Sequence, residues 1–266
     1  MSAPKSGNCP RAVACNIFLL AIFLAAVLLT WWSSRSMGGG VMRMRGGWTM
    51  SMMWMAMPGD SLWSAAAMFL AMWQAMMIAM MLPSAWPMLD LYRRVAISTE
   101  EKLPGLLTAL VGTGYFGAWL GFGLVAFAAG FTWSGAAMRS ASVSGLAPLA
   151  AGAGLILAGA FQLSPWKNAF LTQCRSPLLI LGESWKRGPW SALRLGWKHG
   201  LFCVGCCWAL MLIQIILGAM NLGVMILVAV VIGFEKLWKR GPLLARAAGI
   251  ASMLFGAYLV AAAIRH

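Results

Sequence analysis

Residues 198–219, KHGLFCVGCCWALMLIQIILGA, decide the fold, because they form an apolar run long enough to cross a membrane as a helix. Such a helix needs about 20 mostly apolar residues. The whole chain shares this character, since 61% of its 266 residues are apolar and 10% are charged. A soluble domain carries about 25% charged residues. The composition therefore predicts an integral membrane protein.

Apolar runs of similar character recur along the chain and predict an all-α, polytopic transmembrane helix bundle that forms one domain over residues 1–266. The expected spans are about 13–32, 62–82, 106–131, 146–163, 198–219, 222–238 and 243–264. The fourth run is short and rich in Gly and Ala, so we expect six or seven spans and favour seven. No small-x-small cleavage site follows the first run, which is therefore expected to be a helix and not a signal peptide.

The distribution of Lys and Arg predicts the orientation of the bundle. With seven spans and the N-terminus inside, the outer segments hold only five of the 20 basic residues, namely Arg35, Arg43, Arg45, Arg139 and Arg265. Basic residues concentrate on the cytoplasmic side of membrane proteins. We therefore expect a Met-rich outer loop at 33–61 and a basic cytoplasmic loop at 164–197. The net charge of +14 does not indicate nucleic-acid binding, because no soluble domain is left to carry it.

A cluster of potential metal ligands lies at the start of the run at 198–219. On a helix, its four members share an arc of roughly 100° and roughly 12 Å of axial rise. They are His199, Cys203, Cys206 and Cys207. Thiolate and imidazole are ligands for Cu(I) or zinc, and we favour copper. Packing alone and thiol–disulfide chemistry are the other interpretations.

The spacing Cys203-x-x-Cys206 suits a chelating pair that takes further ligands from another helix. Cys174, on the same expected side of the membrane, is the candidate for a fourth thiol or a resolving partner.

Methionines form a second sulfur-rich region, because 15 of the 21 fall between residues 37 and 88. Thioether is a soft ligand that suits Cu(I) in an oxidising compartment. Within the second span, Met68, Met72, Met76 and Met80 recur at every fourth position. A stripe of this kind also serves as adaptable packing, so both interpretations stay open for the intramembrane methionines.

Topology links the two regions. Two spans separate the second from the fifth, so the end of one and the start of the other share a membrane side. Pro83 and Pro87 predict a kink or break at that end. We hypothesise a route of soft ligands from the outer loop past Met76, Met77, Met80 and Met81 to the cysteines, although a storage site or an assembly factor would use the same geometry.

The motifs of the chain resemble those of a family of uncharacterised bacterial proteins labelled predicted metal-binding integral membrane proteins. The resemblance spans about residues 62–262. It rests on AMMLPSAWPML (79–89), YFGAWLGF (115–122), FQLSPWKNAFLTQCRSPL (161–178), LRLGWKHGLFCVGCCWALML (193–212), GAMNL (218–222) and FEKL (234–237).

This resemblance implies a multi-pass protein of the bacterial inner (plasma) membrane and metal binding at the cysteine cluster. The implied ligands are His199, Cys203, Cys206 and Cys207, with Cys174 and the Met76–Met81 block behind them. Glu235 lies in the FEKL element, where it would neutralise a cation or pair with Lys236 or Lys239.

The sequence favours a copper-handling membrane protein that binds Cu(I) for transport, delivery or homeostasis. The alternatives are a membrane thiol oxidoreductase that uses Cys203 and Cys206, and an accessory subunit of a larger membrane complex. No phosphate-binding loop is visible, and the only histidines are His199 and His266, so no enzyme class is indicated. Expected partners are the lipid bilayer and a membrane protein or metallochaperone.

Overall fold

The computed structural model describes residues 9–37, 41–43, 49–51, 54, 61–219 and 221–265. Within these ranges the chain is helical apart from one short hairpin, as the composition predicts. The elements are α1 (Cys9–Met37), β1 (Val41–Arg43), β2 (Thr49–Ser51), α2 (Leu62–Ser98), α3 (Pro104–Arg139), α4 (Ala141–Gly145), α5 (Ala147–Leu163), α6 (Pro165–Arg175), α7 (Pro177–Ser184), α8 (Pro189–Gly218), α9 (Leu222–Leu237) and α10 (Gly241–Arg265). The hairpin lies inside the expected outer loop, where β1 and β2 pair antiparallel.

Five helices of the described chain are long and apolar enough to cross a membrane, namely α1, α2, α3, α8 and α10. A sixth span is counted if α5 and α6, which meet at 63°, form one broken span. The helix α9 has 16 residues and is about 24 Å long, shorter than the roughly 30 Å hydrocarbon core. The fold is thus compatible with a membrane protein, whereas seven spans and an inside N-terminus stay predictions.

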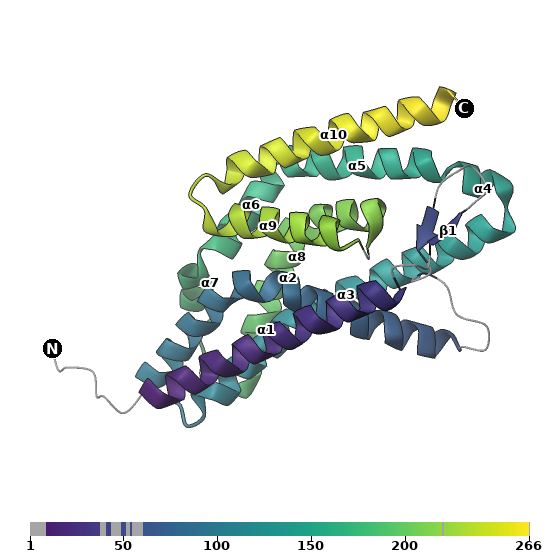
Figure 1. The fold of residues 1–266 in the computed structure, drawn as a ribbon. Coiled ribbons are helices and arrows are strands. Elements are labelled where there is room, and N and C mark those ends of the chain that lie inside the picture. The colour runs from purple at the N-terminus through teal and green to yellow at the C-terminus, as the bar shows by residue number, and fades with distance from the viewer. Residues whose placement is uncertain are drawn as a thin grey trace.

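The helix α10 lies along α5, whereas α3 packs against both α8 and α2, and α1 packs on α2 (Figure 1). The beginning of α1 and the end of α10 lie at opposite ends of the molecule (Figure 1). The short helices α6 and α7 lie where the basic loop is expected and connect α5 to α8.

Three glycines set the contact between α3 and α8. A Cβ on Gly114 would overlap the carbonyl oxygen of Leu193, and one on Gly196 would overlap that of Val111. A Cβ on Gly200 would lie 2.6 Å from the carbonyl oxygen of Tyr115. Small residues let membrane helices approach this closely. The contact brings the middle of α8, where the cysteines lie, against Tyr115.

The helix α2 does not end near residue 82 but continues through Pro83 and Pro87 to Ser98. The side chains around the prolines explain this, because Leu82, Ala85 and Met88 are all buried and their packing favours continued helix. The helix α8 in turn begins at Pro189, nine residues before the apolar run, since proline is favoured in a first helical turn.

Candidate metal centre

Three thiols from α8 form the centre of the site. The ligand atoms of Cys203, Cys206 and Cys207 lie within 4.8 Å of one another, and all three residues are buried. Their spacing of three and four residues places them on one face of a helix, as the sequence predicts. A group of thiols this close is able to share one metal ion.

A fourth thiol reaches the cluster from α6. The sulfur of Cys174 lies 3.5 Å from that of Cys206, which in turn lies 3.3 Å from that of Cys207. The bend between α5 and α6 begins at Ser164, whose hydroxyl accepts a hydrogen bond from the backbone N–H of Lys167 and caps α6. The bend directs α6 to the cysteine-bearing middle of α8.

A glycine on α8 makes the close approach of α6 feasible. A Cβ on Gly205 would lie 2.8 Å from the ring of Phe170, so the ring occupies space that a side chain would fill. Phe170 and Cys174 are four residues apart and share a face of α6. Gly205 therefore helps to place the Cys174 thiol next to Cys206.

Lys236 of α9 places a positive charge on the cluster. Its ammonium group donates hydrogen bonds to the sulfur of Cys203 at 2.9 Å and to the hydroxyl of Ser84 at 3.3 Å. The hydroxyl of Tyr115 lies 2.9 Å from the same sulfur. These groups favour the thiolate form of Cys203, which is the form that binds metals.

No carboxylate of the described residues forms an ion pair with Lys236. The ion pairs of the described residues join Asp90 to Arg93 and Arg94, and Lys167 to Glu235. A charged group away from water is costly unless an opposite charge lies nearby. The sulfur of Cys203 is the group placed to supply that charge.

A second lysine borders the cluster and is fully paired. Lys167 of α6 is completely buried and lies 2.7 Å from a carboxylate oxygen of Glu235, while its ammonium also donates to the carbonyl oxygen of Cys206. The amide of Gln162 donates to the other carboxylate oxygen at 3.2 Å. Glu235 thus pairs with Lys167 and not with its neighbours Lys236 or Lys239.

Sequence reasoning missed Lys167 as part of the site. The residue lies in a segment expected to be a cytoplasmic loop, and no periodic pattern marks it. The one available signal is its place in the motif FQLSPWKNAF, next to the Ser164-Pro165 step at which the chain bends.

His199 lies near the thiols but outside the group that they form. Its ring stacks on that of Tyr115 with a centroid distance of 5.4 Å, and its buried Nδ1 atom has no hydrogen-bond partner in the part of the chain that the structure describes. His199 therefore lies on the helix face that the sequence predicts. The potential ligand atoms that lie closest to one another, however, belong to Cys203, Cys206 and Cys207.

The methionines of α2 that were expected to bind metal are buried in the same core as the thiols; they are Met76, Met77, Met80 and Met81. Two contacts place them relative to α8. The amide of Gln214 donates to the sulfur of Met76 at 3.1 Å, and Lys236 links Ser84 to Cys203. Met80 lies four residues from Ser84, about 6 Å along the helix. It therefore lies between the level of the thiols and that of Gln214.

The outer part of the hypothesised methionine route cannot be followed, because Met44, Met52, Met53, Met55 and Met57 lie outside the described residues.

The fold and the site together define a helical protein, compatible with a membrane location, that carries a buried thiol cluster suited to metal binding. The chain belongs to the PpoB2 family of copper chaperones, whose family model matches residues 70–259. This range includes all four clustered thiols, and the match supports a copper-related family. No curated protein and no solved structure matches the chain.

Proposed function

We propose that the protein is a membrane-embedded copper chaperone that binds Cu(I) through Cys203, Cys206 and Cys207, with Cys174 as a fourth sulfur ligand. The convergence of four thiols from two helices carries this proposal, since the Cys206 sulfur lies within 3.5 Å of both Cys174 and Cys207. Membership of a copper chaperone family supports the choice of metal. Thiolates are soft ligands that select Cu(I).

Charge balance also favours Cu(I) over zinc. Cu(I) needs as few as two thiolates, and if the other two sulfurs of the cluster stay protonated the site has a net charge of −1, which the ammonium of Lys236 neutralises. Zinc prefers four ligands in structural sites, and four thiolates around Zn²⁺ would leave a charge of −2. Lys167 offers no further compensation, because Glu235 already pairs with it. A buried site with no net charge avoids a large desolvation cost.

The methionines of α2 would deliver the ion to the thiols. Met76, Met77, Met80 and Met81 offer neutral thioethers, and Met80 and Met81 precede the thiol level on α2. Cu(I) would pass from these weaker ligands to the thiolates, which bind more tightly because they are charged. From the cysteine cluster the ion would be given to a membrane-protein partner or a metallochaperone. His199 lies beside the cysteine cluster, from which the ion would leave, and it is not assigned as a ligand of the bound ion.

The test is Cu(I) binding by the purified full-length protein under anaerobic conditions, measured by competition with a colorimetric Cu(I) chelator. Cys203→Ser combined with Cys206→Ser should weaken binding more than about a hundredfold, beyond the loss typical of an outer-shell partner. Cys9→Ser combined with Cys15→Ser removes two thiols from α1 and should leave binding unchanged. Stoichiometric copper in the Cys203/Cys206 variant, at wild-type affinity, would overturn the proposal.

Thiol–disulfide chemistry is the second candidate, and the approach of Cys174 to Cys206 favours it. A disulfide between them would join α6 to α8. Mass spectrometry of the protein after mild oxidation and after reduction measures this. A reversible Cys174–Cys206 bond in a protein that binds no copper would favour the oxidoreductase, whereas copper binding with four reduced thiols favours the chaperone.

A further inference from the structure

A basic cavity lies at the beginning of α8, away from the thiols. It has a volume of about 470 Å³ and is lined by Lys186, Arg187, Trp190, Ser191, Arg194, Leu195 and Lys198. Four of these seven residues are basic, and no acidic residue is among the described residues that line it. Such a cavity attracts an anion of modest size.

The fold builds this cavity from two adjacent segments. Ser191, Arg194, Leu195 and Lys198 form one stripe of α8, with the spacing i, i+3, i+4 and i+7. Lys186 and Arg187 belong to the turn before α8, which Gly188 closes with a φ of +101°. That left-handed backbone angle favours glycine, and it folds the turn back beside the helix.

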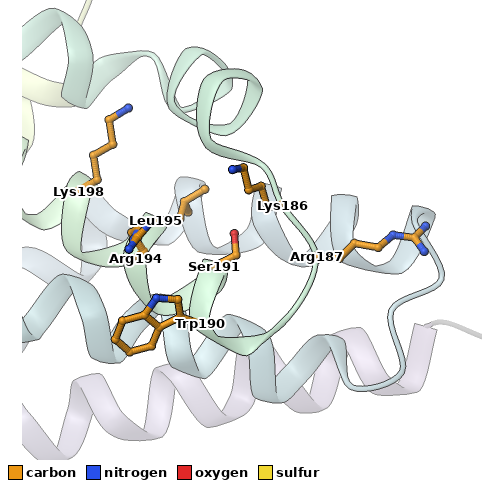
Figure 2. A pocket seen from close by; sticks show the side chains of 7 residues that line it. All are labelled: Lys186, Arg187, Trp190, Ser191, Arg194, Leu195 and Lys198. Carbon is orange, nitrogen blue, oxygen red and sulfur yellow. The ribbon is translucent and has the colours of Figure 1, made fainter.

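The side chains in the cavity are not equivalent. Figure 2 shows the ammonium group of Lys186 near the hydroxyl of Ser191, whereas the ammonium group of Lys198 points away from Ser191 and Arg187 extends away from the others. Arg187 donates a hydrogen bond to the carbonyl oxygen of Thr99 at the end of α2. Lys186 and Arg194 are therefore cations placed to contact an anion in the cavity, and the positive end of the α8 dipole adds to their field.

Exposed aromatic residues place the cavity at a membrane interface. Trp190 and Trp197 lie seven residues apart on the same side of α8 and are 68% and 45% exposed. Leu201, which is 50% exposed, continues this side toward the apolar run. Tryptophan is enriched where hydrocarbon meets the lipid headgroups. The cavity thus opens at headgroup depth, next to a surface that suits acyl chains.

We propose that this cavity binds the phosphate headgroup of an anionic phospholipid. Basic pockets on membrane helices at the cytoplasmic interface recognise such headgroups. Trp190 and Leu195 would contact the glycerol and the first acyl carbons, a role that a soluble anion does not require. The inference rests on the proposed membrane location and not on copper chemistry.

The experiment is native mass spectrometry of the purified full-length protein in detergent, with added phosphatidylglycerol or phosphatidylcholine of identical acyl chains. The wild type should retain phosphatidylglycerol in preference. Lys186→Gln combined with Arg194→Gln should weaken its retention about tenfold or more, because each basic residue near a lipid surface contributes substantially to the attraction.

The matched control is Lys239→Gln combined with Arg240→Gln, which removes the same charge from two exposed residues between α9 and α10. This control should retain phosphatidylglycerol as the wild type does. Equal retention of the two lipids by the wild type, or an equal loss in the control, would overturn the proposal. Displacement of the lipid by inorganic phosphate at equal concentration would identify a free-phosphate site and would also overturn it.

Copper binding separates this inference from the proposed function. The Lys186/Arg194 variant should bind Cu(I) with wild-type affinity, and its elution volume and thermal midpoint should match those of the wild type. If the wild type prefers phosphatidylglycerol but binds no copper, the headgroup site is supported and the proposed function is contradicted.

Discussion

The cysteine cluster in the middle of α8 and the methionine stretch of α2 are both buried and rich in sulfur, but their surroundings differ. Lys236 contacts the thiol of Cys203, and the Lys167–Glu235 ion pair adjoins the backbone of Cys206. The methionine stretch lies in the same core, but there the sulfur of Met76 accepts a hydrogen bond from the neutral amide of Gln214. Charged groups are thus placed beside the ligands that themselves become charged.

This comparison explains how one protein would both hold and move a metal ion. Neutral thioethers need no counter-charge, so they can line an apolar passage at low cost. Thiolates need one, because an isolated charge in an apolar interior is expensive. Variants that remove these charges or these thioethers test whether the charges around the thiols account for this difference.

The largest effect is expected from breaking the buried ion pair. Glu235→Gln leaves Lys167 without its carboxylate and should destabilise the protein by about 3–5 kcal/mol, the cost of removing one partner of a buried pair. Thermal unfolding in detergent measures this. Adding Lys167→Met to Glu235→Gln removes both charges and should restore most of the lost stability. If the double variant is no more stable than Glu235→Gln, loss of the Lys167–Glu235 ion pair is not the cause of the destabilisation.

The next effect is on copper affinity. Lys236→Met keeps an unbranched side chain but removes the ammonium group that contacts Cys203. Cu(I) affinity should fall about tenfold to a hundredfold, the usual cost of losing a partner of a metal ligand. Chelator competition provides the measurement, with Lys239→Met as the control at an exposed position. A Cu(I) affinity equal to that of the wild type would show that Lys236 does not support metal binding.

The smallest equilibrium effect is expected in the methionine stretch. Met80→Leu combined with Met81→Leu conserves volume and should cost less than about 1.5 kcal/mol of stability per substitution. Copper should still bind stoichiometrically, but stopped-flow loading should be slower, because the passage has lost two ligands. Loss of stoichiometric copper would show instead that Met80 and Met81 are primary ligands, and the two regions would no longer differ in role.

Features that depend on a single helix could be predicted from the sequence. The apolar runs predicted the long helices, and the spacing of Cys203, Cys206 and Cys207 predicted their shared face, because both follow from helical periodicity. The length of α2 was not predicted, since packing around Pro83 and Pro87 outweighs the two lost backbone donors.

Contacts between helices could not be predicted, because periodicity gives the face of a helix but not its neighbour. The approach of Cys174 depends on the bend at Ser164 and on the space that Gly205 leaves for Phe170. The pairing of Lys167 with Glu235 joins residues 68 positions apart and leaves no local signal.

X-ray absorption spectroscopy of the Cu(I)-loaded protein is the sharpest test of a thiol-bound ion, because it reports which elements surround the metal. We predict a first shell made of sulfur alone, and we expect this signal to disappear in the Cys203→Ser, Cys206→Ser variant. A first shell that contains nitrogen or oxygen would contradict a thiol-bound ion and would point to His199. A sulfur shell that persists in the variant would place the copper elsewhere in the chain.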